Sequence, residues 1–205
     1  MGENQKSDKC NSVVILAAGQ STRMGRPKFA LKFDENLTFL EKIITGYNSF
    51  GCRQIIVVLN EEGETFLKNN PIKLFSNITI VTNFHPEWER FYSIKIGLRQ
   101  LNEFSCVFIH NVDNPFVNKQ VLKSLQGEMA ETDYVVPCFK GRGGHPVLLS
   151  KKMIKHIIAE KNPELNFRDF LKRHAKKMVE VEDESVLVNV NTSEDYKRLK
   201  KLPDK

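Results

Sequence analysis

Short apolar runs alternate with amphipathic segments along most of this chain. The runs at 13–16, 55–59, 78–81, 107–109 and 134–136 have the length and composition of buried β-strands. Between them, apolar residues repeat at helical spacing, a pattern found at 39–47, 94–101 and 121–125. This alternation predicts an α/β fold in which helices cover both faces of a mostly parallel sheet. Ligands of such sheets bind where the strands reach their carboxyl ends.

The pattern is looser after residue 137, where shorter elements are expected. Strands are predicted at 146–149, 178–181 and 186–190, and helices are predicted at 153–159, 167–173 and 192–200. The chain has 205 residues, of which 40% are hydrophobic, and it contains no repeat or linker-like stretch. We therefore expect one domain over 1–205, with a disordered polar segment at about 1–10.

Charge and cysteine content narrow the function classes. The net charge of +6 favours anionic ligands, but no aromatic residues are interleaved with the basic ones, so nucleic acid is not expected as a partner. No apolar run reaches membrane-spanning length, which argues against a membrane partner. The four cysteines are far apart and form no metal-type pair, as expected of a cytoplasmic protein.

Small residues, glycine and two cations follow the first apolar run. The segment 16–28 reads Leu-Ala-Ala-Gly-Gln-Ser-Thr-Arg-Met-Gly-Arg-Pro-Lys. Its backbone N–H groups are open to a phosphate, and Arg23 and Lys28 add positive charge. The spacing of Gly19 and Gly25 does not fit the P-loop, and Pro27 does not suit the helix of a dinucleotide-binding loop. We predict that Arg23 and Lys28 are catalytic residues acting on a nucleoside triphosphate; the alternative is a surface turn with scattered charge.

A single carboxylate follows another apolar run. Asp113 comes shortly after the run at 107–109 and is followed by Asn114 and Pro115. Mg²⁺ binds oxygen ligands, commonly one or two carboxylates with substrate phosphates and water. Asp113 is therefore a candidate Mg²⁺ ligand, and the alternative is that it caps the turn before Pro115. No Ser/His/Asp or Cys/His pattern indicates covalent catalysis.

Segment 16–28 resembles the signature of nucleotidyltransferases that share the fold of the molybdenum cofactor guanylyl- and cytidylyltransferases, the MobA-like NTP transferases. Sugar-phosphate nucleotidyltransferases and methylerythritol cytidylyltransferases are more distant relatives. The resemblance implies a three-layer α/β/α fold of the nucleotide-diphospho-sugar transferase (GT-A-like) type. It supports Asp113 as the metal ligand. It also implies that the loop binds the nucleotide, through Leu16, Ala17, Ala18, Gly19, Gln20, Ser21, Thr22 and Gly25.

The C-terminal part carries a second point of resemblance. Asn189 and Asn191 occupy alternate positions, as in the family's C-terminal motif, where alternate side chains of a strand face the site. The resemblance implies that Asn191 is a metal ligand and that Asn189 contacts metal or acceptor. The alternative is an Asx turn before the last helix.

Two further segments are similar to substrate-binding parts of the family. Asn83 and Ser93 lie in a segment that resembles the one holding the nucleobase, and both side chains donate and accept hydrogen bonds. The usual glycine after Trp88 is missing here. Gly144 and His145 resemble the Gly-His-Pro-Val segment of the cytidylyltransferase branch, which implies contact with the acceptor.

Together these resemblances imply a magnesium-dependent transfer of a nucleoside monophosphate to a phosphorylated acceptor, with release of pyrophosphate. CTP is favoured and GTP is next, because two segments match the cytidylyl branch and one matches the guanylyl branch. The acceptor is molybdopterin or a sugar or polyol phosphate, and a molybdoenzyme or maturation factor is a conceivable partner. Two other classes stay open: a nucleotide-binding regulatory protein, and a glycosyltransferase, whose usual Asp-x-Asp motif is absent from 112–114.

Overall fold

The computed structural model describes residues 11–19, 26–72 and 75–201. Within them, eight strands form one sheet in the order β3-β2-β1-β4-β7-β5, with β6 and β8 both paired to β5. The strands are β1 (Ser12–Leu16), β2 (Gln54–Asn60), β3 (Ile78–Asn83), β4 (Cys106–Asn111), β5 (Tyr134–Phe139), β6 (Arg142–Gly143), β7 (Val147–Ser150) and β8 (Lys176–Glu180). The disorder expected at 1–10 lies outside the described residues.

Most of the sheet is parallel. β1 pairs in parallel with β2 and β4, β2 with β3, and β5 with β8, whereas β7 runs antiparallel to both β4 and β5. All five residues of β1 are buried, which matches the continuous apolar run expected of a strand covered on both faces. The expectation of a mostly parallel sheet is confirmed, with β7 as an antiparallel insertion.

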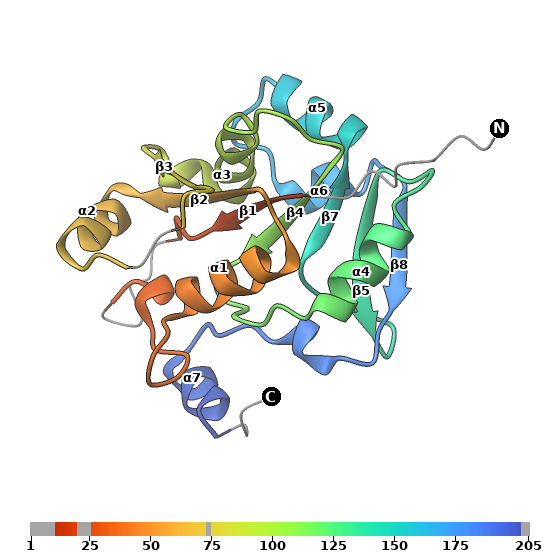
Figure 1. Ribbon diagram of the computed structural model, residues 1–205. Coiled ribbons are helices and arrows are strands. Elements are labelled where there is room, and N and C mark those ends of the chain that lie inside the picture. Colours follow the sequence, from red (N-terminus) through yellow and green to blue (C-terminus); the bar gives the residue numbers. More distant parts are fainter. Residues whose placement is uncertain (1–10, 20–25, 73–74, 202–205) are drawn as a thin grey trace.

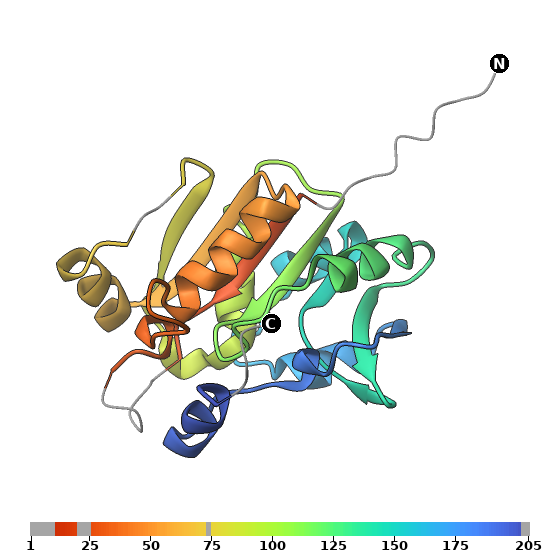
Figure 2. The same cartoon turned by 60° about the horizontal axis from the view of Figure 1, so that its bottom comes forward.

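Helices cover the two faces of the sheet, making three layers (Figure 1). On one face α1 (Phe39–Phe50), α2 (Glu61–Asn69), α4 (Lys119–Gly127) and α7 (Ser193–Leu199) contribute to a core that includes Val13 and Ile15. On the other face α3 (Glu89–Leu98), α5 (Lys151–Ala159) and α6 (Phe167–Leu171) pack with Val14 and Leu16. In Figure 2, α1 lies in front of the strands at the centre of the sheet. Successive residues of β1 thus enter opposite cores, as the pleat of a strand requires.

Local capping explains where several helices begin. The Thr38 side chain accepts from the Glu41 N–H, and the Glu41 carboxylate accepts from the Thr38 N–H, which starts α1 with a capping box. Gly51, at φ 99°, ends that helix in the left-handed conformation that favours glycine. The sequence did not predict α2, because Leu67 is the one large apolar side chain that this helix buries fully.

The predicted strand at 186–190 is wrong. The structure has a 3-10 helix there, η3 (Glu184–Leu187), which begins where the Asp183 side chain accepts from the Ser185 N–H. Beyond it the chain lies against the loop after β4, where Val190 N–H donates to the Asp113 carbonyl at 2.8 Å. Val186 and Val190 are buried in the core and Leu187 and Val188 are partly buried, although no strand pairs with this segment in the described part of the chain.

Candidate functional site

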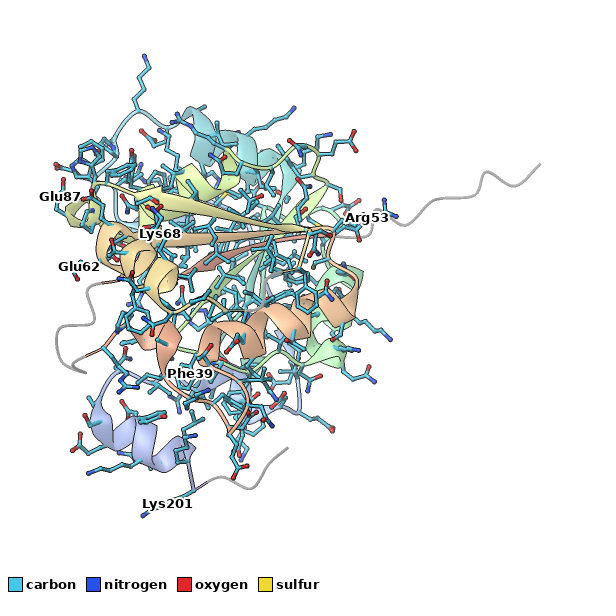
Figure 3. The ribbon with its side chains drawn as sticks, turned by 60° about the vertical axis from the view of Figure 1, so that its left-hand side comes forward. Phe39, Arg53, Glu62, Lys68, Glu87 and Lys201 are labelled. Atoms are coloured by element: carbon cyan, nitrogen blue, oxygen red, sulfur yellow. The ribbon has the colours of Figure 1, made fainter. Side chains whose placement is uncertain are left out.

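A cavity of about 710 Å³ lies at the carboxyl ends of β1 and β4. Glu87, on its rim, lies at the end of the sheet opposite Arg53, which directly precedes β2 (Figure 3). The ends of β1 and β4 with the loops that follow them, two short 3-10 turns and helix α3 line it. The lining residues are Leu16, Ala17, Ala18, Gly19, Lys28, Pro86, Glu87, Arg90, Ser93, Asn111, Val112 and Asp113. The cavity is therefore where an α/β sheet of this kind is expected to bind its ligand.

The loop after β1 forms one wall. The Ala17 N–H donates to the Val58 carbonyl of β2 at 2.8 Å, and the Leu16 carbonyl accepts from the Val112 N–H, just after β4, at 3.0 Å. These two hydrogen bonds fix the start of the loop to the chain on both sides of β1. Gly19 is exposed, and a Cβ added there would meet nothing within 4 Å. The remaining loop residues predicted to act on the nucleotide, Gln20, Ser21, Thr22, Arg23 and Gly25, lie outside the described residues.

Lys28 reaches the site from the 3-10 helix η1 (Lys28–Ala30). Its Nζ donates to Asn191 Oδ1 at 2.7 Å, joining two segments that are far apart in the sequence. Lys28 also acts electrostatically on Asp113. The structure therefore brings together three residues that the sequence predicted separately.

Asp113 presents a carboxylate that is desolvated. Its Oδ1 is buried and has no hydrogen-bond partner among the described residues. Burial raises the pKa of Asp113, whereas the positive charges of Lys28 and Arg90 lower it. A buried acceptor without a donor is unusual, and a cation bound there would satisfy it.

The donor set around Asp113 suits a hard divalent cation that is completed by its substrate. No group of three or more His, Cys, Asp or Glu side chains gathers within 11–19, 26–72 and 75–201, so a closed metal cage is absent from that part. Asp113 and the neutral Asn191 are oxygen donors, and Mg²⁺ commonly uses few protein ligands and several phosphate or water oxygens. The residues present thus fit such an ion.

Asn83 and Ser93 are joined to each other rather than both facing the cavity. Asn83 Nδ2 donates to Ser93 Oγ at 2.9 Å, and Asn83 Oδ1 accepts from the His85 N–H at 2.8 Å. Asn83 is buried, and only Ser93 of the pair lines the cavity. The geometry gives Asn83 the role of holding Ser93 and the turn at His85 in place.

The residues predicted to contact the acceptor lie behind the cavity wall. A Cβ on Gly144 would lie 2.3 Å from the Val186 carbonyl oxygen, so Gly144 lets the backbone pack closely on η3. His145 Nε2 lies 3.5 Å from Asn111 Nδ2, and its Nδ1 is buried with no partner in the described part of the molecule. Asn189 is exposed, and its Nδ2 donates to the Leu187 carbonyl at 3.3 Å. Gly144, His145 and Asn189 are not among the cavity-lining residues, and their contact with an acceptor stays a prediction.

Burial makes His145 a neutral side chain. Desolvation, with smaller effects of Arg90 and His110, lowers the pKa of His145 to about 3. An imidazole of this kind is uncharged at neutral pH, so it takes part through hydrogen bonding rather than charge.

Sequence reasoning missed Arg90 and Asn111 as site residues. Both line the cavity, and Arg90 is one helical turn before Ser93 on α3, so the two share a face of that helix. That spacing was the available signal. Asn111 directly ends β4, two residues before Asp113, and the alternation along a strand also pointed to it.

A larger cavity of about 920 Å³ lies elsewhere and shares no lining residue with the strand-end cavity. Phe33, Phe116 and Phe139 contribute to it, together with Lys42 and Arg142. None of the residues predicted from the sequence lines it. The strand-end cavity is therefore the candidate functional site.

Comparisons with known proteins show the family to which this chain belongs. The family model described as "MobA-like NTP transferase domain" matches residues 13–178. The molybdenum cofactor cytidylyltransferase of Escherichia coli K12 is 27% identical over 185 residues, covering 89% of this chain and 92% of that protein. A probable molybdenum cofactor guanylyltransferase of Clostridium perfringens is 28% identical over 201 residues, covering 92% of this chain and 95% of that protein.

A solved structure has the same fold. Rv0371c from Mycobacterium tuberculosis H37Rv superposes with a TM-score of 0.78 at 22% identity, over 95% of this chain and 100% of that chain. A second structure of that protein, described as a complex with manganese, has a TM-score of 0.72. The fold is the nucleotide-diphospho-sugar transferase type that the sequence predicted. No helix in the described ranges is long and apolar enough to cross a membrane.

Proposed function

Since this chain belongs to the family of MobA-like NTP transferase domains and is a nucleotidyltransferase, we propose that it transfers a nucleoside monophosphate from CTP, or next from GTP, to a phosphorylated acceptor. Pyrophosphate is the other product. Among the acceptors, molybdopterin ranks first, as in a molybdenum cofactor cytidylyltransferase, and a sugar or polyol phosphate is the second choice. The proposal rests above all on one observation: Lys28 and Asp113, from distant segments, line the same cavity.

The reaction is an in-line displacement at phosphorus. An oxygen of the acceptor phosphate forms a bond to the α-phosphorus of the nucleotide, and the bond from that phosphorus to the bridging oxygen breaks. The electron pair leaves with pyrophosphate. A phosphate nucleophile is already ionised near neutral pH, so this step needs no general base. Catalysis is then positioning and charge neutralisation.

Lys28 supplies the positive charge on the side of the loop after β1. Its ammonium is held by Asn191 Oδ1 at 2.7 Å, so it is oriented before the nucleotide arrives. The loop amides near Gly19 and the Lys28 ammonium would bind the triphosphate tail and stabilise charge that develops on the leaving pyrophosphate. Arg23 is proposed to assist them.

Asp113 and Asn191 are the residues proposed to hold Mg²⁺. The desolvated Oδ1 of Asp113 and the amide oxygen of Asn191 are suitable hard donors. When bound, the cation would neutralise negative charge on the phosphate oxygens. Asn191 Oδ1 has a second lone pair beyond the one that accepts from Lys28, so both roles are compatible.

CTP is proposed ahead of GTP on the basis of the loop and of Ser93. Ser93 lines the cavity, its hydroxyl is held by Asn83 at 2.9 Å, and a serine hydroxyl suits contact with a pyrimidine edge. The relatives include both a cytidylyltransferase and a guanylyltransferase, so the nucleobase needs a direct test.

The test combines nucleotide binding with turnover. Thermal shifts with each of the four NTPs and Mg²⁺ identify the nucleotide, and release of pyrophosphate in the presence of molybdopterin or a panel of phosphate monoesters measures transfer. Lys28→Gln and Asp113→Asn should each lower kcat/KM by about a hundredfold to a thousandfold, because each removes one charge-stabilising contact. Lys32→Gln, an exposed lysine four residues after Lys28, is the matched control. Unchanged turnover in Lys28→Gln or Asp113→Asn would remove that residue from the mechanism, and no NTP-dependent shift in the wild type would refute the function.

A further inference from the structure

Arg90 is a cation in the cavity that feels the charge of Asp113 but forms no ion pair among the described residues. Its Nε is buried and has no hydrogen-bond partner within the described residues. No described carboxylate lies within ion-pair distance of it, and its guanidinium carbon lies 5.2 Å from the centre of the Phe167 ring. The fold thus places a permanent positive charge against an aromatic ring at the edge of the cavity.

A buried guanidinium of this kind is costly in the ligand-free protein. Arginine does not lose its proton in proteins, so burial cannot neutralise it. Charged groups that are taken from water are normally compensated by an opposite charge and by hydrogen bonds. Asp113 acts on Arg90 from beyond ion-pair distance and leaves its Nε without a hydrogen bond, so an anion that accepts directly from the guanidinium would complete this part of the cavity.

Arg90 and Lys28 approach Asp113 from different parts of the fold. Lys28 belongs to η1, which follows the loop after β1, whereas Arg90 belongs to α3 and packs on Phe167 of α6. Both positive charges act on the Asp113 carboxylate. Two anionic phosphates that must meet repel each other, and one cation for each of them lowers that repulsion.

The neighbours of Arg90 also suit an anion. Arg90 acts electrostatically on His145, and Asn111, whose amide nitrogen lies 3.5 Å from His145 Nε2, is one of the residues that line the cavity. The Asn111 amide nitrogen faces His145 Nε2, which leaves Nδ1 as the protonated nitrogen, a buried donor with no partner among the described atoms. Arg90 and Asn111 therefore line this part of the cavity as donors, with the neutral His145 beside Asn111 outside the lining.

We propose that Arg90 binds the phosphate group of the acceptor and makes the enzyme selective for a dianionic phosphate, either a monoester or inorganic phosphate. This inference rests on the proposed function of the same cavity. The planar guanidinium presents two parallel N–H groups that a phosphate can accept together, and a dianionic phosphate carries more negative charge than a carboxylate or a neutral hydroxyl. An oxygen of the phosphate held by Arg90 attacks the α-phosphorus, and pyrophosphate leaves with the electron pair of the broken bond. With inorganic phosphate as the smallest acceptor, the products are a nucleoside diphosphate and pyrophosphate.

The experiment measures binding of inorganic phosphate to the full chain already saturated with a non-hydrolysable analogue of the preferred NTP and Mg²⁺. The analogue occupies the triphosphate part of the cavity, so calorimetry reports the second anion alone. Arg90→Gln should weaken phosphate binding by about tenfold to a hundredfold, as expected for loss of a charged hydrogen bond. Arg90→Lys keeps the charge without the planar fork and should fall between Arg90→Gln and the wild type.

Arg99→Gln is the matched control, because Arg99 is exposed at the end of the same helix and its loss changes the net charge equally. This variant should bind phosphate as the wild type does. Acetate replaces phosphate in a second titration and should bind more weakly to the wild type than phosphate does.

The outcomes separate the inference from the function on which it rests. No NTP binding in the wild type defeats the proposed function itself. NTP binding with no phosphate binding in the wild type, or with equal phosphate binding in Arg90→Gln, overturns the inference alone. Loss of NTP binding in Arg90→Gln, as in Lys28→Gln, also overturns it, because Arg90 would then serve the nucleotide. If Arg90→Gln does not fold, the comparison of Arg90→Lys with Arg99→Gln decides in the same way.

Discussion

Replacing Gly144 by alanine should destabilise the whole C-terminal side of the site. The added Cβ would lie 2.3 Å from the Val186 carbonyl oxygen and 2.7 Å from its carbonyl carbon. These are backbone atoms, so no flexible side chain can move away, and η3 itself has to shift. Three hydrogen bonds hold η3 at this point: His145 N–H donates to the Val186 carbonyl at 2.8 Å, and Asn114 Nδ2 donates to the Ser185 carbonyl at 3.0 Å and to the Val186 carbonyl at 3.4 Å.

The magnitude follows from these contacts. Forcing extra volume into a packed region costs about 1–3 kcal/mol, and a weakened hydrogen bond adds about 1 kcal/mol. The free energy of unfolding should therefore fall by about 2–4 kcal/mol. For a chain of 150–250 residues each kcal/mol lowers Tm by about 2–4 °C, so the expected loss is about 4–16 °C.

Gly143→Ala provides the comparison at the neighbouring position. A Cβ on Gly143 would meet Val136 Cγ1 at 3.4 Å, which is an ordinary contact, and the residue is exposed in β6. Urea unfolding and thermal melts of the two variants, side by side with the wild type, measure the difference. Gly143→Ala should lie within about 0.5 kcal/mol of the wild type.

The Gly144→Ala variant also tests what Gly144 does for function. A shift of η3 would pass to Val190 and Asn191, which bind the Asp113 carbonyl and Lys28, so turnover should fall together with stability. A Gly144→Ala protein as stable as Gly143→Ala would refute the packing argument. If its KM for the acceptor alone rose, Gly144 would instead serve direct contact with the acceptor.

Two further predictions concern buried polar groups. Desolvation lowers the pKa of His145 to about 3 and that of His110 to about 4, both below the ordinary value of about 6.5, so the unfolded chain binds more protons between these values. The free energy of unfolding should therefore be highest above pH 6.5 and should fall as the pH drops, by up to about 2 kcal/mol for each histidine between pH 6.5 and 5. Equal midpoints of urea unfolding at pH 6.5 and pH 5 would contradict this prediction. Asn83→Ala should lower the free energy of unfolding by about 1–3 kcal/mol, because Asn83 holds both Ser93 and the His85 N–H, and it should weaken NTP binding through Ser93. The control is Asn70→Ala, which removes an exposed amide that donates to the Phe66 carbonyl. If Asn83→Ala matches this control in Tm and in its NTP-dependent thermal shift, Asn83 does not hold Ser93 and the turn at His85 in place.

Much of the fold was readable because its signals are local. The apolar runs became β1 to β5, and the helical repeats at 39–47 and 121–125 became α1 and α4. Lys28 and Asp113 were placed at strand ends by the same alternation, and parallel strands bring such ends to one edge. These features depend on the spacing of residues close together in the chain.

The sequence misled where the partner is distant. The apolar residues at 186–190 looked like a strand, but Asp183 and the packing on Gly144 and the loop after β4 make their first part a 3-10 helix. Asn83 looked like a base contact, yet its two hydrogen bonds turn inward. A short apolar run or a single amide carries no information about which distant segment will pack on it.

The order of apolar and polar residues alone determined the layered α/β fold and the position of the loop and carboxylate at one edge of the sheet, because period and strand direction act locally. Only the tertiary structure decided that Asn191 holds Lys28, that Gly144 makes room for η3, and that Arg90 lines the same cavity as Asp113 with its Nε unpaired among the described residues. Each of these features depends on distances between segments that are far apart in the chain. Each also depends on burial, because the electrostatic interactions of a charge or an unpaired donor are stronger where water does not screen them.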